Sequence, residues 1–113
     1  MKQVSFEGIG QVLATFQAGE GVVEGHTVRV SGNGMVEPCT DGGSVDGVAV
    51  VVKNGCAAVQ VRGFATVKAT GVTVGRVKLS ADASGGMKTD EEGGTPYLVA
   101  EADTTAGTIA VLL

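Results

Sequence analysis

Three kinds of residue in this sequence could in principle do chemistry: a histidine, two cysteines and several clustered carboxylates. His26 is the only histidine, in the run "EGHTV", and no serine or cysteine near it forms a nucleophile signature. Cys39 and Cys56 are too few for a disulfide framework, and together with His26 they match no zinc-ligand spacing. The sequence therefore predicts a surface or turn histidine, two reduced and partly buried thiols, and no metal site.

The carboxylates lie in two predicted turns. Asp41 and Asp46 belong to one, and Asp90, Glu91 and Glu92 form the run "DEEGG" in the other. Acidic loops supply oxygen ligands to calcium, but a dedicated site alternates its Asp and Asn ligands with other residues, and this run does not. We therefore expect a solvated turn, no cofactor and no enzymatic activity.

The charge and hydropathy of the chain exclude two classes of partner. The net charge is -4, and the lysines and arginines are scattered singly without a basic stripe, so nucleic acid is not expected to bind. No segment approaches the roughly 20 apolar residues of a membrane span, so no membrane partner is expected. One lysine but no continuous apolar run marks the first ten residues, so no signal peptide is expected.

The composition predicts short strands around a thin core. Gly accounts for 19 of the 113 residues, well above the usual share of about 7%, which indicates many tight turns. Hydrophobic residues make up 43% of the chain but aromatic residues only 4%, so the core consists mainly of Val and Ala. Such a domain often gains stability by burying further surface against copies of itself or a partner.

The chain is predicted to be all-β, a small barrel or sandwich of short antiparallel strands. No window shows a sustained helical period, and Asn-Gly at 33–34 and at 54–55 are strong hairpin signals. The predicted strands are Val4–Phe6, Val12–Phe16, His26–Ser31, Met35–Glu37, Val45–Lys53, Ala57–Arg62, Phe64–Ala69, Val77–Ala81, Met87–Lys88, Leu98–Asp103 and Thr108–Leu112.

The stretch "GCAAVQVRGFATVKATG" at 55–71 alternates small apolar residues with polar ones, as half-buried strands do. One large apolar residue, Phe64, falls on the polar side. It either belongs to a contact surface or packs under a loop or the amino-terminal segment. The predicted inward residues are Ala57, Val59, Val61, Gly63, Ala65, Val67 and Ala69, and the predicted outward residues are Gln60, Arg62, Thr66, Lys68 and Thr70.

A weak internal repeat with an offset of about 50 residues divides the chain. It predicts an amino-terminal strand or arm at 1–20 and a single β domain at 21–113, with pseudo-repeats at 21–70 and 71–113. The first segment is rich in large apolar residues. It is predicted either to complete the barrel as an edge strand or to add to a neighbour's sheet. These residues are Phe6, Ile9, Val12, Leu13 and Phe16.

Several runs of the sequence resemble the small head-decoration, or capsid-cement, proteins of tailed bacteriophages and prophages. They are "GEGVVEGHTVRVSGNGMVEPCTDGGSVDGVAV", "GCAAVQVRGFATVKATG" and "VGRVKLSADASGGMKTDEEGGTPYLVAEADTTAGTIAVLL". The resemblance extends from about Gly8 to Leu113 and involves structural signatures without catalytic residues. The chain departs from the pattern in its low aromatic content and at Lys68 and Ala69, where the pattern has Pro and Tyr.

The resemblance implies a virion structural protein made in the bacterial cytoplasm, which binds the capsid exterior and stabilises the shell. Its implied partners are the major capsid protein and further copies of itself, as a homotrimer at least on the capsid. We hypothesise that Phe6, Ile9, Val12, Phe16, Arg62 and Phe64 contribute to the interface. The alternative is a stand-alone β-rich module that binds carbohydrate or protein, which would require exposed aromatic residues and an export signal.

Overall fold

Turn chemistry sets the strand boundaries, as the hairpin signals predict. The computed structural model describes Phe6 and residues 9–113, so most of the predicted strand Val4–Phe6 lies outside the described residues. Asn54 and Gly55 have φ of 55° and 76°, which is the backbone of a tight two-residue hairpin turn. The Asn-Gly pairs at 33–34 and 54–55 both join consecutive strands, so these two predicted hairpins are confirmed.

The all-β prediction is confirmed, since the described residues form ten strands and no helix. The predicted and observed strands agree closely, and the predicted strand Val12–Phe16 extends to Ala18. The strands are β1 (Val12–Ala18), β2 (Thr27–Gly32), β3 (Met35–Pro38), β4 (Gly47–Lys53), β5 (Cys56–Arg62), β6 (Phe64–Lys68), β7 (Gly75–Ala81), β8 (Met87–Thr89), β9 (Thr95–Asp103) and β10 (Thr108–Leu112).

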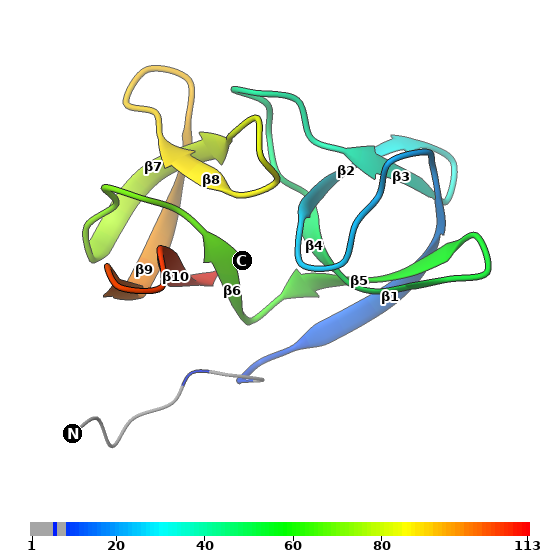
Figure 1. Ribbon diagram of the computed structural model, residues 1–113, viewed down its shortest axis with the longest axis horizontal. Coiled ribbons are helices and arrows are strands. Elements are labelled where there is room, and N and C mark those ends of the chain that lie inside the picture. The colour runs from blue at the N-terminus through cyan, green and yellow to red at the C-terminus, as the bar shows by residue number, and fades with distance from the viewer. Residues whose placement is uncertain (1–5, 7–8) are drawn as a thin grey trace.

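The strands form a closed barrel and a second sheet that lie side by side (Figure 1). In the barrel the order is β1-β3-β2-β4-β5, and it closes because β1 pairs with both β3 and β5. The second sheet has the order β6-β10-β9-β7-β8. One pair departs from the predicted antiparallel arrangement: β1 and β3 are parallel, at Gln17 with Met35 and Ala18 with Val36.

Both halves connect their strands in the same way. Hairpin β2–β3 corresponds to β7–β8, hairpin β4–β5 corresponds to β9–β10, and β1 lies beside β5 as β6 lies beside β10. The matching segments are therefore 12–62 and 64–112, whereas the sequence repeat places the units at 21–70 and 71–113. The repeat read from the sequence omits the match between "LATFQA" at 13–18 and "FATVKA" at 64–69, which share three of six residues.

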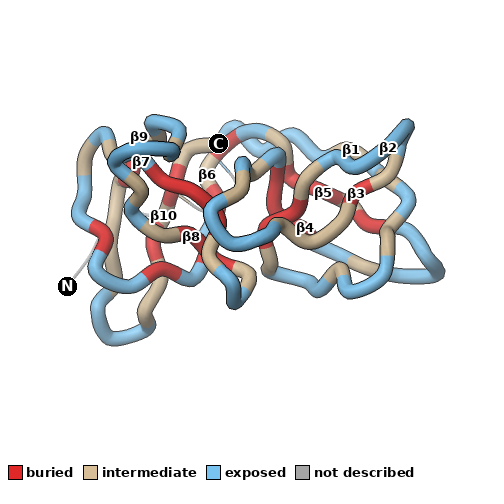
Figure 2. The backbone as a smooth tube through the Cα atoms, turned by 90° about the horizontal axis from the view of Figure 1, so that it is seen from above, coloured by how far each residue is buried: buried red, intermediate tan, exposed pale blue. Residues whose placement is uncertain are grey.

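Two apolar clusters underlie the two halves, and buried stretches are visible in both (Figure 2). One fills the barrel and includes Val28, Val36 and Val59. The other lies mainly in the second sheet and includes Leu79 and Ile109, but it also takes in Val48 of β4. The second sheet therefore packs against the outside of the barrel, and Val48 connects the two halves.

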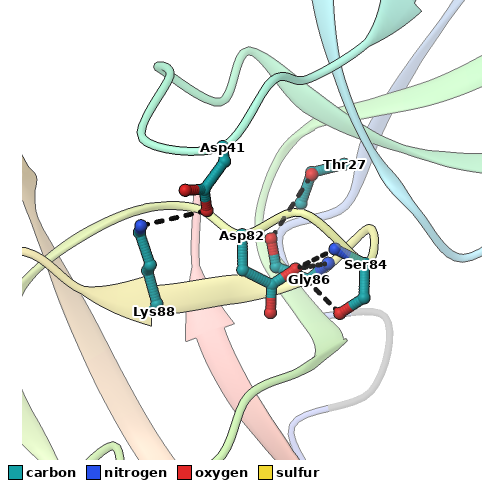
Figure 3. Close-up of polar contacts among 6 residues, drawn as sticks. All are labelled: Thr27, Asp41, Asp82, Ser84, Gly86 and Lys88. Carbon is teal, nitrogen blue, oxygen red and sulfur yellow. Dashed lines mark hydrogen bonds and ion pairs between the residues drawn. The ribbon is translucent and has the colours of Figure 1, made fainter.

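Polar contacts reinforce this packing between the halves (Figure 3). The Thr27 hydroxyl donates to the Gly86 carbonyl oxygen at 3.4 Å, and Lys88 Nζ lies 3.0 Å from Asp41 Oδ1. Asp82 shapes the β7–β8 turn, because its Oδ1 accepts from the amides of Ser84 and Gly86 at 2.9 and 2.8 Å. The contacts of Gly86 and Lys88 hold this ordered turn and β8 against the barrel.

The alternation predicted for 55–71 is confirmed at most positions, with one clear error. Ala57, Val59, Ala65 and Val67 are buried as predicted, but Gln60, predicted to face outwards, is only 4% exposed. The strand period of two places Gln60 correctly on the outer face of the barrel. It is buried because the second sheet and the chain at Gly63 cover this part of the barrel.

Candidate interaction surface

The chain passes from the barrel to the second sheet through a single residue, Gly63, between β5 and β6. Gly63 has φ of 93°, and a Cβ placed there would lie 2.5 Å from the carbonyl carbon and oxygen of Gly10. Two backbone segments therefore cross in contact, and only glycine allows this approach. The Leu113 amide also donates to the Gly63 carbonyl oxygen at 2.9 Å, so the carboxyl end meets the same point.

Phe64 packs against the amino-terminal segment. Its ring centroid lies 5.1 Å from that of Phe6, with the ring planes inclined at 47°, which is a favourable aromatic arrangement. The Phe64 amide donates to the Ile9 carbonyl oxygen at 3.0 Å. Phe64 therefore packs against the amino-terminal segment, and it remains only partly buried, so part of its surface is still available for a contact with another molecule.

Val12 and Arg62 continue this surface along the barrel. They face each other across β1 and β5, next to an irregularity in the register between Val12 and Leu13. Ile9 is 53% exposed and Val12 50% exposed, and the Arg62 side chain is exposed as well. We call Phe6, Ile9, Val12, Arg62 and Phe64 the junction surface, since they gather where the halves meet.

Phe16, the sixth residue in the predicted set, lies elsewhere. Its side chain packs against the buried cluster inside the barrel. The strand period explains the separation, because Phe16 falls on the inner face of β1 and pairs with buried Ala57 of β5. The structure therefore brings together five of the six predicted residues.

The sequence does not indicate two residues near this surface, Gln60 and Leu13, as candidates for the interface. Gln60 Nε2 donates to the carbonyl oxygens of Arg62 and Phe64 at 3.1 and 2.8 Å, and so binds both ends of the turn at Gly63. Leu13 is 48% exposed although it follows exposed Val12 directly. The register shifts between these two residues, because β5 has one extra residue, Val61, between their partners. A strict period of two predicts that only one of the two side chains is exposed.

The residues considered for chemistry have structural roles or are isolated. The His26 ring lies over Gly85, where any Cβ would collide with it, so it fills space between the halves. Burial raises the pKa of the Cys39 thiol, which donates to the Ser44 carbonyl oxygen at 3.4 Å. Both cysteines are free, but Cys56 is exposed, so the prediction of a partly buried thiol is wrong for this residue. Among Phe6 and residues 9–113, no three His, Cys, Asp or Glu side chains are grouped to hold a metal ion.

The acidic run at 90–94 forms a turn that is closed by its own first carboxylate. The Gly93 amide donates to Asp90 Oδ1 at 2.8 Å. This hydrogen bond lowers the pKa of Asp90 below its ordinary value of 3.8. Glu91 and Glu92 are exposed, so the turn is solvated.

We expect the free energy of unfolding of Asp90→Asn to fall less steeply with decreasing pH than that of the wild type. A carboxylate with a lowered pKa stabilises the fold above 3.8, and this stabilisation is lost as the pH falls through its pKa in the folded protein. Urea unfolding of both proteins at neutral pH and at successive values below about pH 4 measures the difference. Glu91→Gln removes a charge from the same turn, and an equal flattening by this control would contradict the prediction.

Comparison of the sequence with models of known protein families gives no match, and comparison with curated proteins gives none either. Within the described part of the chain, no helix is long and apolar enough to cross a membrane. The resemblance to head-decoration proteins therefore stays a prediction from the sequence motifs.

Proposed function

We propose that this chain is a non-catalytic virion protein that binds the outer surface of a phage head and stabilises it. The junction surface is the observation that carries the proposal. It places half-exposed Ile9 and Val12 beside an aromatic pair and the exposed Arg62. Aromatic residues and arginine are enriched in protein interfaces, and this chain has few aromatic residues to distribute.

The junction surface is also held firmly in place. The Phe64 amide bonds to Ile9, and Gln60 bonds to the carbonyl groups on both sides of Gly63. A surface that is ordered before binding loses less conformational entropy when a partner arrives. The proposed partner is the major capsid protein, and three copies of this chain are proposed to gather around each local threefold position.

Phe64→Ala is expected to weaken binding to the shell. Burial of such a ring contributes on the order of 1.5–3 kcal/mol, and the Phe64 ring also supports the ring of Phe6. Without it, the affinity for the shell should fall roughly tenfold to hundredfold. The measurement is co-sedimentation of the purified protein with expanded head shells, assembled from the major capsid protein of the same genome and lacking this chain.

The matched control is Val74→Ala. Val74 is 60% exposed, the highest value among the large hydrophobic residues that the structure describes, and it lies in the loop before β7, outside the junction surface. Shell binding by this variant should equal that of the wild type. Absence of binding by the wild-type protein would overturn the proposed function, and equal binding by Phe64→Ala would remove Phe64 from the interface.

A further inference from the structure

The first half of β1 has one edge that no described strand covers. On one side, β1 pairs with β5 along its length, from Val12 to Gln17. On the other side it pairs with β3 only at Gln17 and Ala18. Figure 1 shows β1 running along the lower side of the barrel and extending past it towards the amino terminus. In the part of the chain that the structure describes, this edge has no neighbour before Gln17.

The hydrogen-bond pattern shows which backbone groups point to the open edge. The Ala18 amide donates to the Gly55 carbonyl oxygen at 2.9 Å, which fixes the phase of the β1–β5 ladder. Groups of successive residues alternate in direction along an antiparallel ladder, so Gln17 must point away from β5. It does so, because its amide donates to the Gly34 carbonyl oxygen on the β3 side at 2.8 Å.

By the same alternation, Leu13 and Thr15 direct their amide and carbonyl groups to the open edge. Their side chains lie on the outer face of the barrel, and Leu13 is half-exposed. Exposed edge strands usually carry a lysine, another charge or a proline that prevents pairing with another chain. The sequence of β1 is "VLATFQA", which contains none of these. Among Phe6 and residues 9–113, nothing pairs with this edge, and β1 itself carries no residue that prevents pairing.

We propose that this edge is a self-association site, at which β1 of a second copy adds antiparallel to form a continuous sheet across two barrels. A twofold axis beside Ala14 places Leu13 of each copy opposite Thr15 of the other. All the free groups of these residues then pair, which gives four backbone hydrogen bonds. Such an interface is closed, since each copy contributes the same surface.

The positions next to these residues exclude the neighbouring registers. An axis at Thr15 would pair Leu13 with Gln17, whose amide already bonds to Gly34. An axis at Leu13 would pair Thr15 with Gln11, which lies outside the strand. With the axis at Ala14, the small side chains of Ala14 meet at the centre, and half-exposed Leu13 packs beside Thr15 of the other copy. The contact belongs to the free protein and does not depend on the proposed function.

Thr15→Pro tests the contact directly. The substitution removes the amide hydrogen that faces the open edge, and the β1–β5 ladder does not use that amide. The mass in solution, measured by light scattering over a hundredfold range of concentration, should rise from one chain towards two for the wild type. Thr15→Pro should remain at the mass of one chain throughout.

Thr66→Pro is the matched control in the second half. Thr66 lies opposite Ala110 in the β6–β10 ladder. The Ala69 amide donates to Gly107 across this ladder, and the direction alternates from residue to residue. The Thr66 amide therefore faces away from β10. The variant should associate like the wild type. Leu13→Lys is the second test variant, because a lysine protects an edge without altering the backbone, and circular dichroism establishes that each variant is folded.

Hydrogen exchange on the wild type gives an independent readout. The amides of Leu13 and Thr15 should become protected as concentration rises, and the Thr66 amide should not change. A mass of one chain at every concentration would overturn the proposal, as would a dimer that persists in folded Thr15→Pro and Leu13→Lys. A mass of three chains would also overturn it while supporting the proposed threefold assembly, so the two proposals can fail separately.

Discussion

Gly63→Ala should lower the free energy of unfolding by about 3 kcal/mol or more, although the substitution removes no contact and only adds a methyl group. Two causes add. A residue with a Cβ is strained at φ of 93°, and that Cβ would lie 2.5 Å from the Gly10 carbonyl group. Because the obstacle is backbone on both sides, no side-chain rotation can relieve the collision. The measurement is urea unfolding at neutral pH, followed by circular dichroism.

Gly55→Ala separates the two causes. Gly55 also has positive φ, at 76°, but a Cβ there would meet nothing within 4 Å. The free energy of unfolding of this control should fall by only about 1–2 kcal/mol, which is the strain of placing a residue with a Cβ at positive φ. Equal losses at both positions would show that the crossing with Gly10 contributes nothing. The crossing also sets the junction surface, so shell binding should weaken in any folded Gly63→Ala protein.

The sequence predicts the strands well because strand period and turn chemistry are local properties. The Asn-Gly turns and the alternation around Val59 and Val67 depend only on neighbouring residues. Pairings between distant strands are not local. The parallel contact of β1 with β3 joins Gln17 to Met35, and nothing in either short segment specifies it.

The candidate site was harder to predict for the same reason. The pattern places Gln60 and Phe64 on the outer face, which is correct for an isolated sheet. Their burial depends on what covers that face, namely the second sheet and the segment containing Phe6 and Ile9. A buried glutamine and an exposed glutamine look alike in sequence, since the difference lies in the partners of the amide group.

The paired halves explain how so thin a core can support a fold. Each half contains mainly valine and alanine, which contribute little apolar area singly. Val48 belongs by strand to the barrel and by packing to the second sheet, so the second sheet does not bury its core alone. The residues between the halves therefore matter more to stability than their number suggests.

Gln60→Glu should lower the free energy of unfolding by about 2–4 kcal/mol at neutral pH, although the side chains have nearly the same shape. The amide of Gln60 donates to the carbonyl oxygens of Arg62 and Phe64 at 3.1 and 2.8 Å. An ionised carboxylate cannot donate to either oxygen, and it would be repelled by both. Burial would disfavour its charge further, since this side chain is only 4% exposed.

The loss should depend on pH in a defined direction. Burial and the two facing carbonyl oxygens would raise the pKa of the introduced carboxyl group above the value of about 4.3 in the unfolded chain. An acid whose pKa is raised by folding destabilises the fold at high pH. The deficit relative to the wild type should therefore shrink as the pH falls from the raised pKa towards 4.3. Below that point it should become constant, because the carboxyl group is then protonated in both states.

Gln60→Met is the matched control. Methionine has a similar length but no N–H donor and no charge, so both carbonyl oxygens lose their donor at every pH. Its deficit should not change over the same pH range. Urea unfolding of the three proteins between about pH 4 and pH 8 measures both effects. A deficit that is the same at every pH for Gln60→Glu would show that the side chain turns out to solvent, and that the turn at Gly63 does not depend on its two donors.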